Sequence, residues 1–255
     1  MTPAALPLAA EVIAVVFIGL ALGSLASLLV HRLPRGLPVG RTRSRCPRCG
    51  ARLGARDLVP LVSWLAARGR CRHCGGAIGW RYPAIEASTA LAVLAGWAVT
   101  GVGAQAACLA VLATALIAAA AVDLEWRILP DSALLAAGAA GLGWRALAGG
   151  TWAGTVLGAA LLAALALGLR AWFTRRRGVE ALGLGDVKLM AVAGLWLPPA
   201  ALPAFLVLAG TAGTLLGLAW QRHHGAHQFP FGPALAFGLY ATVLAHTAAP
   251  GVVGV

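Results

Sequence analysis

Long apolar stretches separated by short polar gaps run through most of this chain and restrict what it can fold into. A membrane-spanning helix needs about 20 mostly apolar residues. Of the 255 residues, 60% are hydrophobic and 11% are charged, whereas soluble domains carry about 25% charged residues. We therefore predict an all-α polytopic membrane protein with about eight transmembrane helices, at roughly 8–30, 84–101, 104–122, 131–148, 152–172, 186–199, 200–220 and 231–250.

The basic residues indicate which side of the membrane each gap faces. Twelve of the 20 Lys and Arg residues, all of them Arg, lie between Arg32 and Arg81. In an eight-span topology, the gaps on the same side hold Arg127, three consecutive arginines at 175–177, and Arg222. Because cytoplasmic loops are enriched in Lys and Arg, we predict that this side is the cytoplasm and that an uncleaved first span has its N-terminus outside. Because these cations lie at the ends of membrane spans, we predict that the partner of the chain is a lipid bilayer and not a nucleic acid.

The polar insert at 31–83 carries four of the five cysteines as two Cys-x-x-Cys pairs, Cys46 with Cys49 and Cys71 with Cys74. Each pair offers two thiolates from one tight turn, which suits tetrahedral zinc, and disulfides are rarer in a reducing cytosol. We predict a structural zinc site in a small, zinc-ribbon-like cytoplasmic domain. A redox pair and two disulfides are the alternatives. The chain then divides into a first helix at 1–30, this domain at 31–83 and a membrane domain at 84–255.

Two aspartates are predicted at membrane depth on one face. Asp123 follows an apolar run at the end of the third span, and Asp186 opens the sixth span. Ionisable groups at this depth are costly and usually functional. The two spans run in opposite directions, so both carboxylates fall on the cytoplasmic face. Two carboxylates that share a proton supply a base to activate water and an acid to polarise a carbonyl. We predict an aspartic-protease pair.

Simpler roles are open for the same residues. Asp186 would also serve as a helix cap, and capping is the preferred interpretation of Asp131, which follows Pro130. Asp123 ends its predicted helix, where a negative charge meets the unfavourable end of the helix dipole, so a structural ion pair with Arg127 is its alternative. Lys188 is either an interfacial anchor or a cation that favours ionised Asp186.

Five blocks of sequence, in order, resemble the type IV prepilin peptidases, also called leader peptidase/N-methyltransferases. They are Gly23-Ser24 through Arg32-Leu33-Pro34, the paired-cysteine insert with Arg81-Tyr82-Pro83, the block Asp123-Leu124-Glu125, the block Gly183-Leu184-Gly185-Asp186-Val187-Lys188, and the block Phe229-Pro230-Phe231-Gly232-Pro233. The likeness covers nearly the whole chain. In the first block, Leu25 and Ser27 stand where the family has Phe and Asn.

The resemblance implies an enzyme of the bacterial inner membrane, with its active site and cysteine domain facing the cytoplasm. Asp123 and Asp186 would cleave a prepilin or pseudopilin after the glycine that ends its leader. Gly183 and Gly185 would let the substrate backbone approach closely, with Lys188 beside them as a further substrate-binding residue. The resemblance also implies N-methylation of the new N-terminus with S-adenosylmethionine as donor, and a peptidase without this second activity is the alternative.

Three other classes of protein share parts of this pattern. A zinc-ribbon membrane anchor would explain the insert but leave Asp123 and Asp186 without a role. A transporter would use the carboxylates as a proton relay, but relays more often lie near mid-membrane within broken helices. A preflagellin or presenilin-like protease would share the Gly-x-Gly-Asp block, without a reason for the cysteine pairs.

Overall fold

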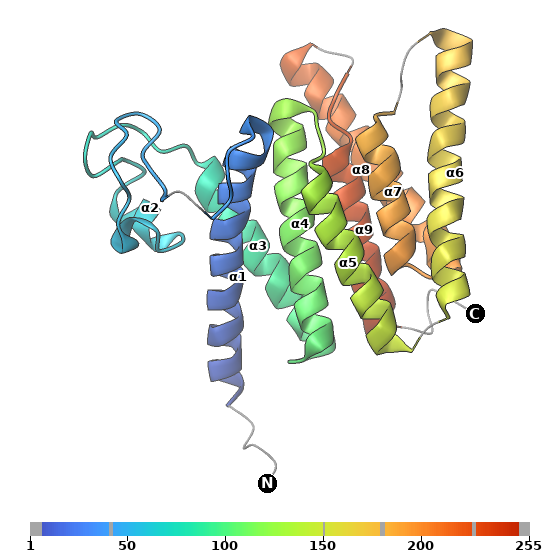
Figure 1. The fold of residues 1–255 in the computed structure, drawn as a ribbon, viewed down its shortest axis with the longest axis horizontal. Helices are drawn as coiled ribbons and strands as arrows, with labels where there is room; N and C mark the ends of the chain where they lie inside the picture. The colour runs from blue at the N-terminus through green and yellow to red at the C-terminus, as the bar shows by residue number, and fades with distance from the viewer. Residues whose placement is uncertain (1–6, 41–42, 150, 179–181, 226–227, 250–255) are drawn as a thin grey trace.

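The computed structural model describes residues 7–40, 43–149, 151–178, 182–225 and 228–249, and over these residues the chain is built from helices (Figure 1). The α-helices are α1 (Leu8–Arg32), α2 (Val62–Ala66), α3 (Arg81–Thr100), α4 (Ala104–Trp126), α5 (Asp131–Ala148), α6 (Trp152–Arg177), α7 (Leu184–Trp196), α8 (Leu202–His224) and α9 (Gly232–Ala248). Short 3-10 turns are η1 (Leu33–Arg35), η2 (Ala55–Asp57) and η3 (Pro199–Ala201).

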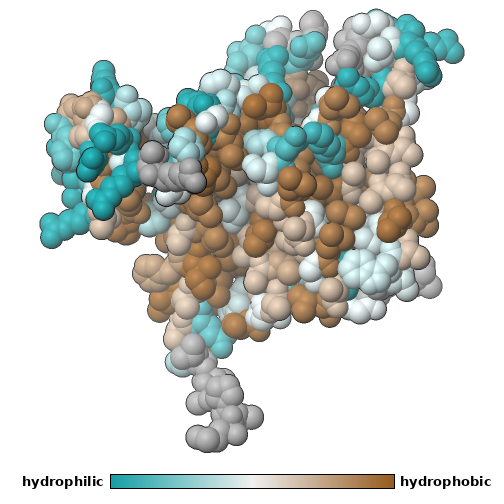
Figure 2. Space-filling model, in the orientation of Figure 1, coloured by the Kyte–Doolittle hydropathy of each residue, from teal (hydrophilic) through white to brown (hydrophobic). Residues whose placement is uncertain are grey.

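The helices other than α2 stand side by side and alternate in direction, with α1 at one edge of the row and α6 at the other (Figure 1). The cysteine insert, which includes α2, lies beside the upper end of α1. The ends of α4, α6 and α8 and the starts of α5, α7 and α9 also lie at this upper end. Hydrophilic residues cover the insert and gather at the upper ends of the helices, while the flank below is mostly hydrophobic (Figure 2). This distribution is the one expected of a helical bundle with a bilayer around its flank.

Five of the helices are long and apolar enough to cross a membrane. These are α1, α3, α4, α6 and α8, so the membrane assignment holds while the predicted count of eight is not confirmed. Apart from α2 in the insert, the other three are shorter: α5 has 18 residues, α9 has 17 and α7 has 13. At 1.5 Å per residue, α7 is about 20 Å long, less than the hydrocarbon thickness of about 30 Å.

Two helix ends differ from the prediction in a way that matters for the aspartates. Helix α4 continues to Trp126, so Asp123 lies in its last turn and does not end it; Arg127, with φ 54°, closes the helix by donating its backbone N–H to the Asp123 carbonyl oxygen at 2.9 Å. Helix α7 begins at Leu184, so Asp186 is its third residue and not its first.

Close contacts between backbones hold neighbouring helices together. Gly19 and Gly23 of α1 face the backbone of α3, where a Cβ on Gly23 would lie 2.6 Å from the Cα of Glu86. In the same way a Cβ on Gly194 of α7 would lie 2.3 Å from the carbonyl carbon of Gly158 in α6. Small residues at such positions are what allows helices to pack closely in lipid. The largest buried cluster draws on α4, α5, α6, α7, α8 and α9, with Phe205 among its fully buried side chains.

Widening the α6–α7 contact tests this packing. Gly194→Val is expected to destabilise the protein by about 1–3 kcal/mol, because the new side chain overlaps the backbone of α6. Gly168→Val on α6 is the matched control, since a Cβ there meets nothing within 4 Å. Thermal unfolding in detergent measures the difference, and equal midpoints for the two variants would contradict the packing described.

Candidate functional site

The four cysteines of the insert come together in one cluster. Their Sγ atoms all lie within 4.8 Å of one another, and four thiolates at 2.3 Å from a zinc ion would be about 3.8 Å apart. Cys46 and Cys71 are buried, while Cys49 and Cys74 are exposed. The donor set and its spacing therefore fit a tetrahedral metal ion, as the sequence predicted.

Each pair of cysteines sits on the same kind of turn. The backbone N–H of Cys46 donates to the Ala51 carbonyl at 2.9 Å, and that of Cys71 donates to the Gly76 carbonyl at 2.8 Å. The glycine after each pair takes positive φ, 69° at Gly50 and 67° at Gly75, a conformation that costs glycine little. The repeat of one turn in two places directs both pairs of sulfurs to a common centre.

The first turn favours a thiolate at one of its two cysteines. The backbone N–H groups of Cys49 and Arg48 point at the sulfur of Cys46 and lower the pKa of this thiol to about 6. A deprotonated sulfur is the form that binds a metal. The pKa of the Cys49 thiol in the same turn is instead raised to about 11, partly by its proximity to the Cys46 sulfur, so the turn favours one thiolate at Cys46 before a metal binds.

The first membrane carboxylate, Asp123, is buried and held by another helix. The residue is only 6% exposed. Its Oδ2 accepts a hydrogen bond from the backbone N–H of Gly232, the first residue of α9, at 2.9 Å. An N–H at a helix N-terminus carries partial positive charge. The interaction compensates for a carboxylate in the last turn of its own helix, where the dipole is unfavourable.

A short aromatic segment positions Gly232. Phe231 lies against Gly213 of α8, where a Cβ would be 2.3 Å from its ring, and Phe229 lies against Gly217, one turn along. The two rings meet edge to face at 6.2 Å between centroids. The sequence singled out the block that contains these residues, but it gave no sign that the block holds Asp123.

The second carboxylate, Asp186, closes the start of its own helix. Its Oδ2 accepts the backbone N–H of Gly183, the N-cap residue of α7, at 3.1 Å. The capping role considered from the sequence is thus present in the structure. It leaves the other carboxylate oxygen of Asp186 outside this hydrogen bond, so capping and a chemical role are compatible.

The two carboxylates lie near each other at the upper end of the bundle. They are close enough to interact electrostatically, and one side chain, Leu129 of the α4–α5 link, packs against a glycine beside each of them. A Cβ on Gly185 would be 3.0 Å from the Cβ of Leu129, and one on Gly232 would be 2.9 Å from its Cδ2. Asp123 and Asp186 are 63 positions apart in the sequence. Helix packing brings them to the same end of the bundle, as the sequence predicted.

Lys188 and Asp131 form an ion pair with each other, with 2.6 Å between Nζ and Oδ1. The preferred interpretation of Asp131 as a cap is wrong, because its helix has no side-chain capping hydrogen bond. Lys188 is engaged with Asp131 rather than with Asp186. Among the described ion pairs none joins Arg127 to Asp123; the backbone of Arg127 closes α4 instead.

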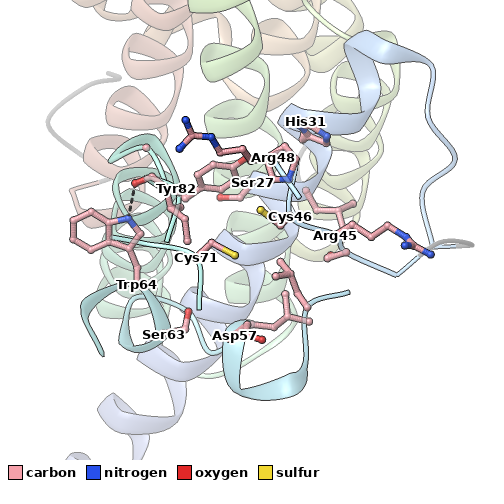
Figure 3. Close-up of a pocket in the computed structure, with 18 of the residues that line it drawn as sticks. Ser27, His31, Arg45, Cys46, Arg48, Asp57, Ser63, Trp64, Cys71 and Tyr82 are labelled. Atoms are coloured by element: carbon pink, nitrogen blue, oxygen red, sulfur yellow. Dashed lines mark hydrogen bonds between the residues drawn. The ribbon is translucent and has the colours of Figure 1, made fainter. Parts of the chain in front are cut away.

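A cavity of about 650 Å³ lies between the insert and the upper ends of α1 and α3. Ser27 of α1 and Tyr82 of α3 lie close together on one side of it, and the sulfurs of Cys46 and Cys71 face the same space (Figure 3). The indole of Trp64 supports the wall by donating to the Ile78 carbonyl at 3.1 Å. The sequence gave no sign of this space, because its wall joins residues from 24 to 86.

Comparisons with known proteins cover nearly the whole chain. Residues 17–99 match the bacterial peptidase A24 N-terminal domain, and residues 110–218 match the type IV leader peptidase family. A prepilin leader peptidase/N-methyltransferase of Burkholderia pseudomallei is 37% identical, over 94% of this chain and 87% of its own length.

Two further relatives agree with this match. One of the same name from Dickeya chrysanthemi is 34% identical over 91% of this chain and 93% of its own length. A type 4 prepilin-like proteins leader peptide-processing enzyme of Escherichia coli is 33% identical over 94% of both. No solved structure matches the chain.

The cysteine cluster makes a direct prediction about metal content. Purified full-length protein is expected to bind about one divalent ion per chain, since four thiolates form one tetrahedral site. Cys71→Ser is expected to abolish this binding, whereas Cys108→Ser, at a partly buried cysteine of α4 outside the cluster, is expected to leave it unchanged. Elemental analysis of the purified variants measures it; equal metal in wild type and Cys71→Ser would refute the site.

Proposed function

Because this chain belongs to the type IV leader peptidase family, we propose that it removes the leader from prepilins or pseudopilins and N-methylates the residue so exposed. The relatives' names support both activities. The observation that carries the first is the pairing of Asp123 and Asp186 at one end of a multi-pass inner-membrane bundle. A zinc-ribbon anchor or a transporter would leave that pairing unexplained.

The chemistry follows from two carboxylates that share one proton. The ionised member takes a proton from a water molecule, and the protonated member donates a hydrogen bond to the scissile carbonyl oxygen. Backbone N–H groups hold both side chains, Gly232 for Asp123 and Gly183 for Asp186, so neither carboxylate needs to reorient as charge moves between them. Preorganisation of this kind lowers the barrier to hydrolysis.

The residues around the pair suit an extended substrate. Gly183 and Gly185 carry no side chain that would keep a peptide backbone away from Asp186. Lys188 is a further proposed substrate-binding residue. Its ammonium would contact a substrate either while it stays paired with Asp131 or after that ion pair has broken. The leader lies on the cytoplasmic side in this proposal, with the active site and the cysteine insert, because the arginines of the insert favour that side.

The proposed topology keeps eight spans, in which the shorter helices α5, α7 and α9 each pack against at least one longer helix. The domains proposed are the first helix at 1–30, the cysteine domain at 31–83 and the membrane peptidase domain at 84–255. Zinc is the proposed metal of the cysteine cluster, because four cysteine thiolates in a tetrahedron are its usual structural site. Its role there is to fold the insert over the ends of α1 and α3.

S-adenosylmethionine is the proposed methyl donor, and it supplies an electrophilic methyl group when bound. The cavity beside the cysteine cluster suits a ligand of this class, because small-molecule sites are typically about 300–1,000 Å³. The aromatic side chains of Trp64 and Tyr82 in its wall could stack on a nucleobase or face a sulfonium cation.

Loss of either carboxyl tests the peptidase. Asp123→Asn and Asp186→Asn are each expected to reduce leader cleavage by about 10²–10⁴-fold, the usual contribution of acid–base catalysis. Asp57→Asn is the control, because Asp57 lies in the insert and pairs with Arg72. Prepilin cleavage in membranes that contain equal amounts of each protein measures the loss; normal activity in either variant would exclude the two-aspartate mechanism.

A methyl group on Gly232 tests how Asp123 is held. In Gly232→Ala the new Cβ would lie 2.7 Å from Asp123 Oδ2, so the carboxylate must move. Displacement by about 1 Å can cost 10²-fold in rate, and cleavage is expected to fall at least about tenfold. Gly210→Ala on α8, where a Cβ meets nothing within 4 Å, is the matched control. If the two alanine variants cleave at the same rate, the Gly232 contact has no part in catalysis.

A further inference from the structure

The cavity beside the cysteine cluster has two different sides. The insert provides one side, with several arginines, Asp57 and the buried cysteines. The upper ends of α1 and α3 provide the other side, which includes Ser27 and His31 (Figure 3) as well as Arg32 and Glu86. Three of the arginine side chains on the wall already have partners, and one of these, Arg32 at the end of α1, donates to the Pro38 carbonyl at 2.8 Å. Arg72 pairs with Asp57 at 3.4 Å, and Arg45 donates to the Gly50 carbonyl at 3.1 Å. The carboxylate of Asp57 on the insert side is thus occupied by Arg72, whereas the helix side offers two further acceptor groups, Glu86 and Ser27, to a ligand.

Glu86 is the first of these acceptors. It is partly buried at the start of α3, and one of its oxygens, Oε2, accepts the backbone N–H of Leu61 at 2.8 Å. Among the described residues no cation pairs with this carboxylate. Buried carboxylates are normally paired with a cation or fully hydrogen-bonded. A carboxylate that lines a cavity without such a partner points to a cationic ligand.

Ser27 is the second acceptor. Its residue is only 5% exposed, and its Oγ has no hydrogen-bond partner among the described residues. A hydroxyl buried in this way costs about 1–3 kcal/mol of stability unless a partner is supplied. Because Ser27 lines the same cavity as Glu86, one bound group with several donors would satisfy both.

A small cluster of buried apolar side chains lies between this cavity and the aspartate pair. Val122, next to Asp123, packs in one cluster with Ile85, next to Glu86, and with Ala26, next to Ser27. The cavity and the scissile-bond site are thus neighbours across three helices at the same end of the bundle. A chain end released at the aspartates has a short way to travel to Glu86.

We propose that this cavity receives the N-terminal amine exposed by leader cleavage, with the Glu86 carboxylate and the Ser27 hydroxyl as its hydrogen-bond acceptors. An ammonium group has three N–H donors and one positive charge. It would therefore supply the cation that the Glu86 carboxylate lacks and the hydrogen-bond donor that the Ser27 hydroxyl lacks. The proposal rests on the function proposed above and names the residues that hold the substrate of its second step. It also gives the cysteine insert a role, since the insert closes the cavity over these residues.

The methylation step balances with these groups. The ammonium gives one proton to Glu86, which is feasible at cytoplasmic pH because α-amino groups titrate near pH 8. The freed nitrogen lone pair then forms a bond to the methyl carbon of a sulfonium donor. The carbon–sulfur bond of the donor breaks and leaves its electron pair on sulfur, so the products are a secondary ammonium and a neutral thioether.

The test separates charge from structure at Glu86. Glu86→Gln keeps an oxygen to accept the Leu61 N–H but removes the negative charge. The methylated fraction of the cleaved pilin is expected to fall at least about tenfold, as for loss of a charge-assisted hydrogen bond. Ser27→Ala removes an unpartnered hydroxyl without cost to folding, and a fall of about 2–10-fold is expected. Asp57→Asn, a carboxylate of the same cavity that pairs with Arg72, is the matched control.

A binding measurement on the full-length chain gives a readout independent of methylation. A labelled peptide with the sequence of the mature pilin N-terminus is expected to bind at least about tenfold more tightly with a free amine than with an acetylated one. Glu86→Gln and Ser27→Ala should narrow that preference, and Asp57→Asn should not. Wild-type preference in both variants would overturn the proposal. If the wild-type chain cleaves pilin without methylating it, the proposed methylation fails, and the binding comparison still decides whether Glu86 and Ser27 hold an amine.

Discussion

A buried carboxylate at the end of a membrane helix needs a partner, and the hydrogen bond from Gly232 to Asp123 provides it. The donor belongs to the first residue of α9, so the partial positive charge of one helix end offsets the unfavourable end of another. Placing that N–H requires the two aromatic rings of Phe229 and Phe231 to lie on the glycine positions of α8. This polar contact links α4 to α9, and the two aromatic rings link the start of α9 to α8 at the same end of the bundle.

The cysteine insert is stabilised in a different way. An insert of this size with few large apolar side chains needs a metal or a disulfide to fold, and four sulfurs within 4.8 Å of one another suit a metal. Its middle is joined to the membrane domain through Leu61, the residue before α2, which takes a positive φ of 58° and donates its N–H to Glu86. The metal-binding turns, the cavity and the start of α3 are therefore one connected unit, placed a few side chains away from the aspartate pair.

Much of this arrangement could be predicted from the sequence, because its signals are local or periodic. Apolar runs located the long helices, Cys-x-x-Cys spacing located the cluster, and the alternation of spans placed Asp123 and Asp186 on one face. Contacts between distant segments could not be read in this way. The partner of Asp123 lies 109 positions away, and that of Lys188 lies 57 positions away. Asp131 looked like a cap because it follows a proline, and only the packing of α5 against α7 shows that its partner is Lys188.

The central claim is that a substrate's scissile bond meets the membrane domain between Asp123 and Asp186, and Leu129 offers the most direct test. Its side chain lies against both Gly185 and Gly232, so a photo-crosslinking residue at this position should label a bound prepilin at the junction of leader and mature sequence, and excess unlabelled prepilin should suppress the label. The same residue at Leu91, which is 66% exposed on α3, should give no such product. Labelling from Leu129 that misses the junction, or that matches the labelling from Leu91, would contradict the account.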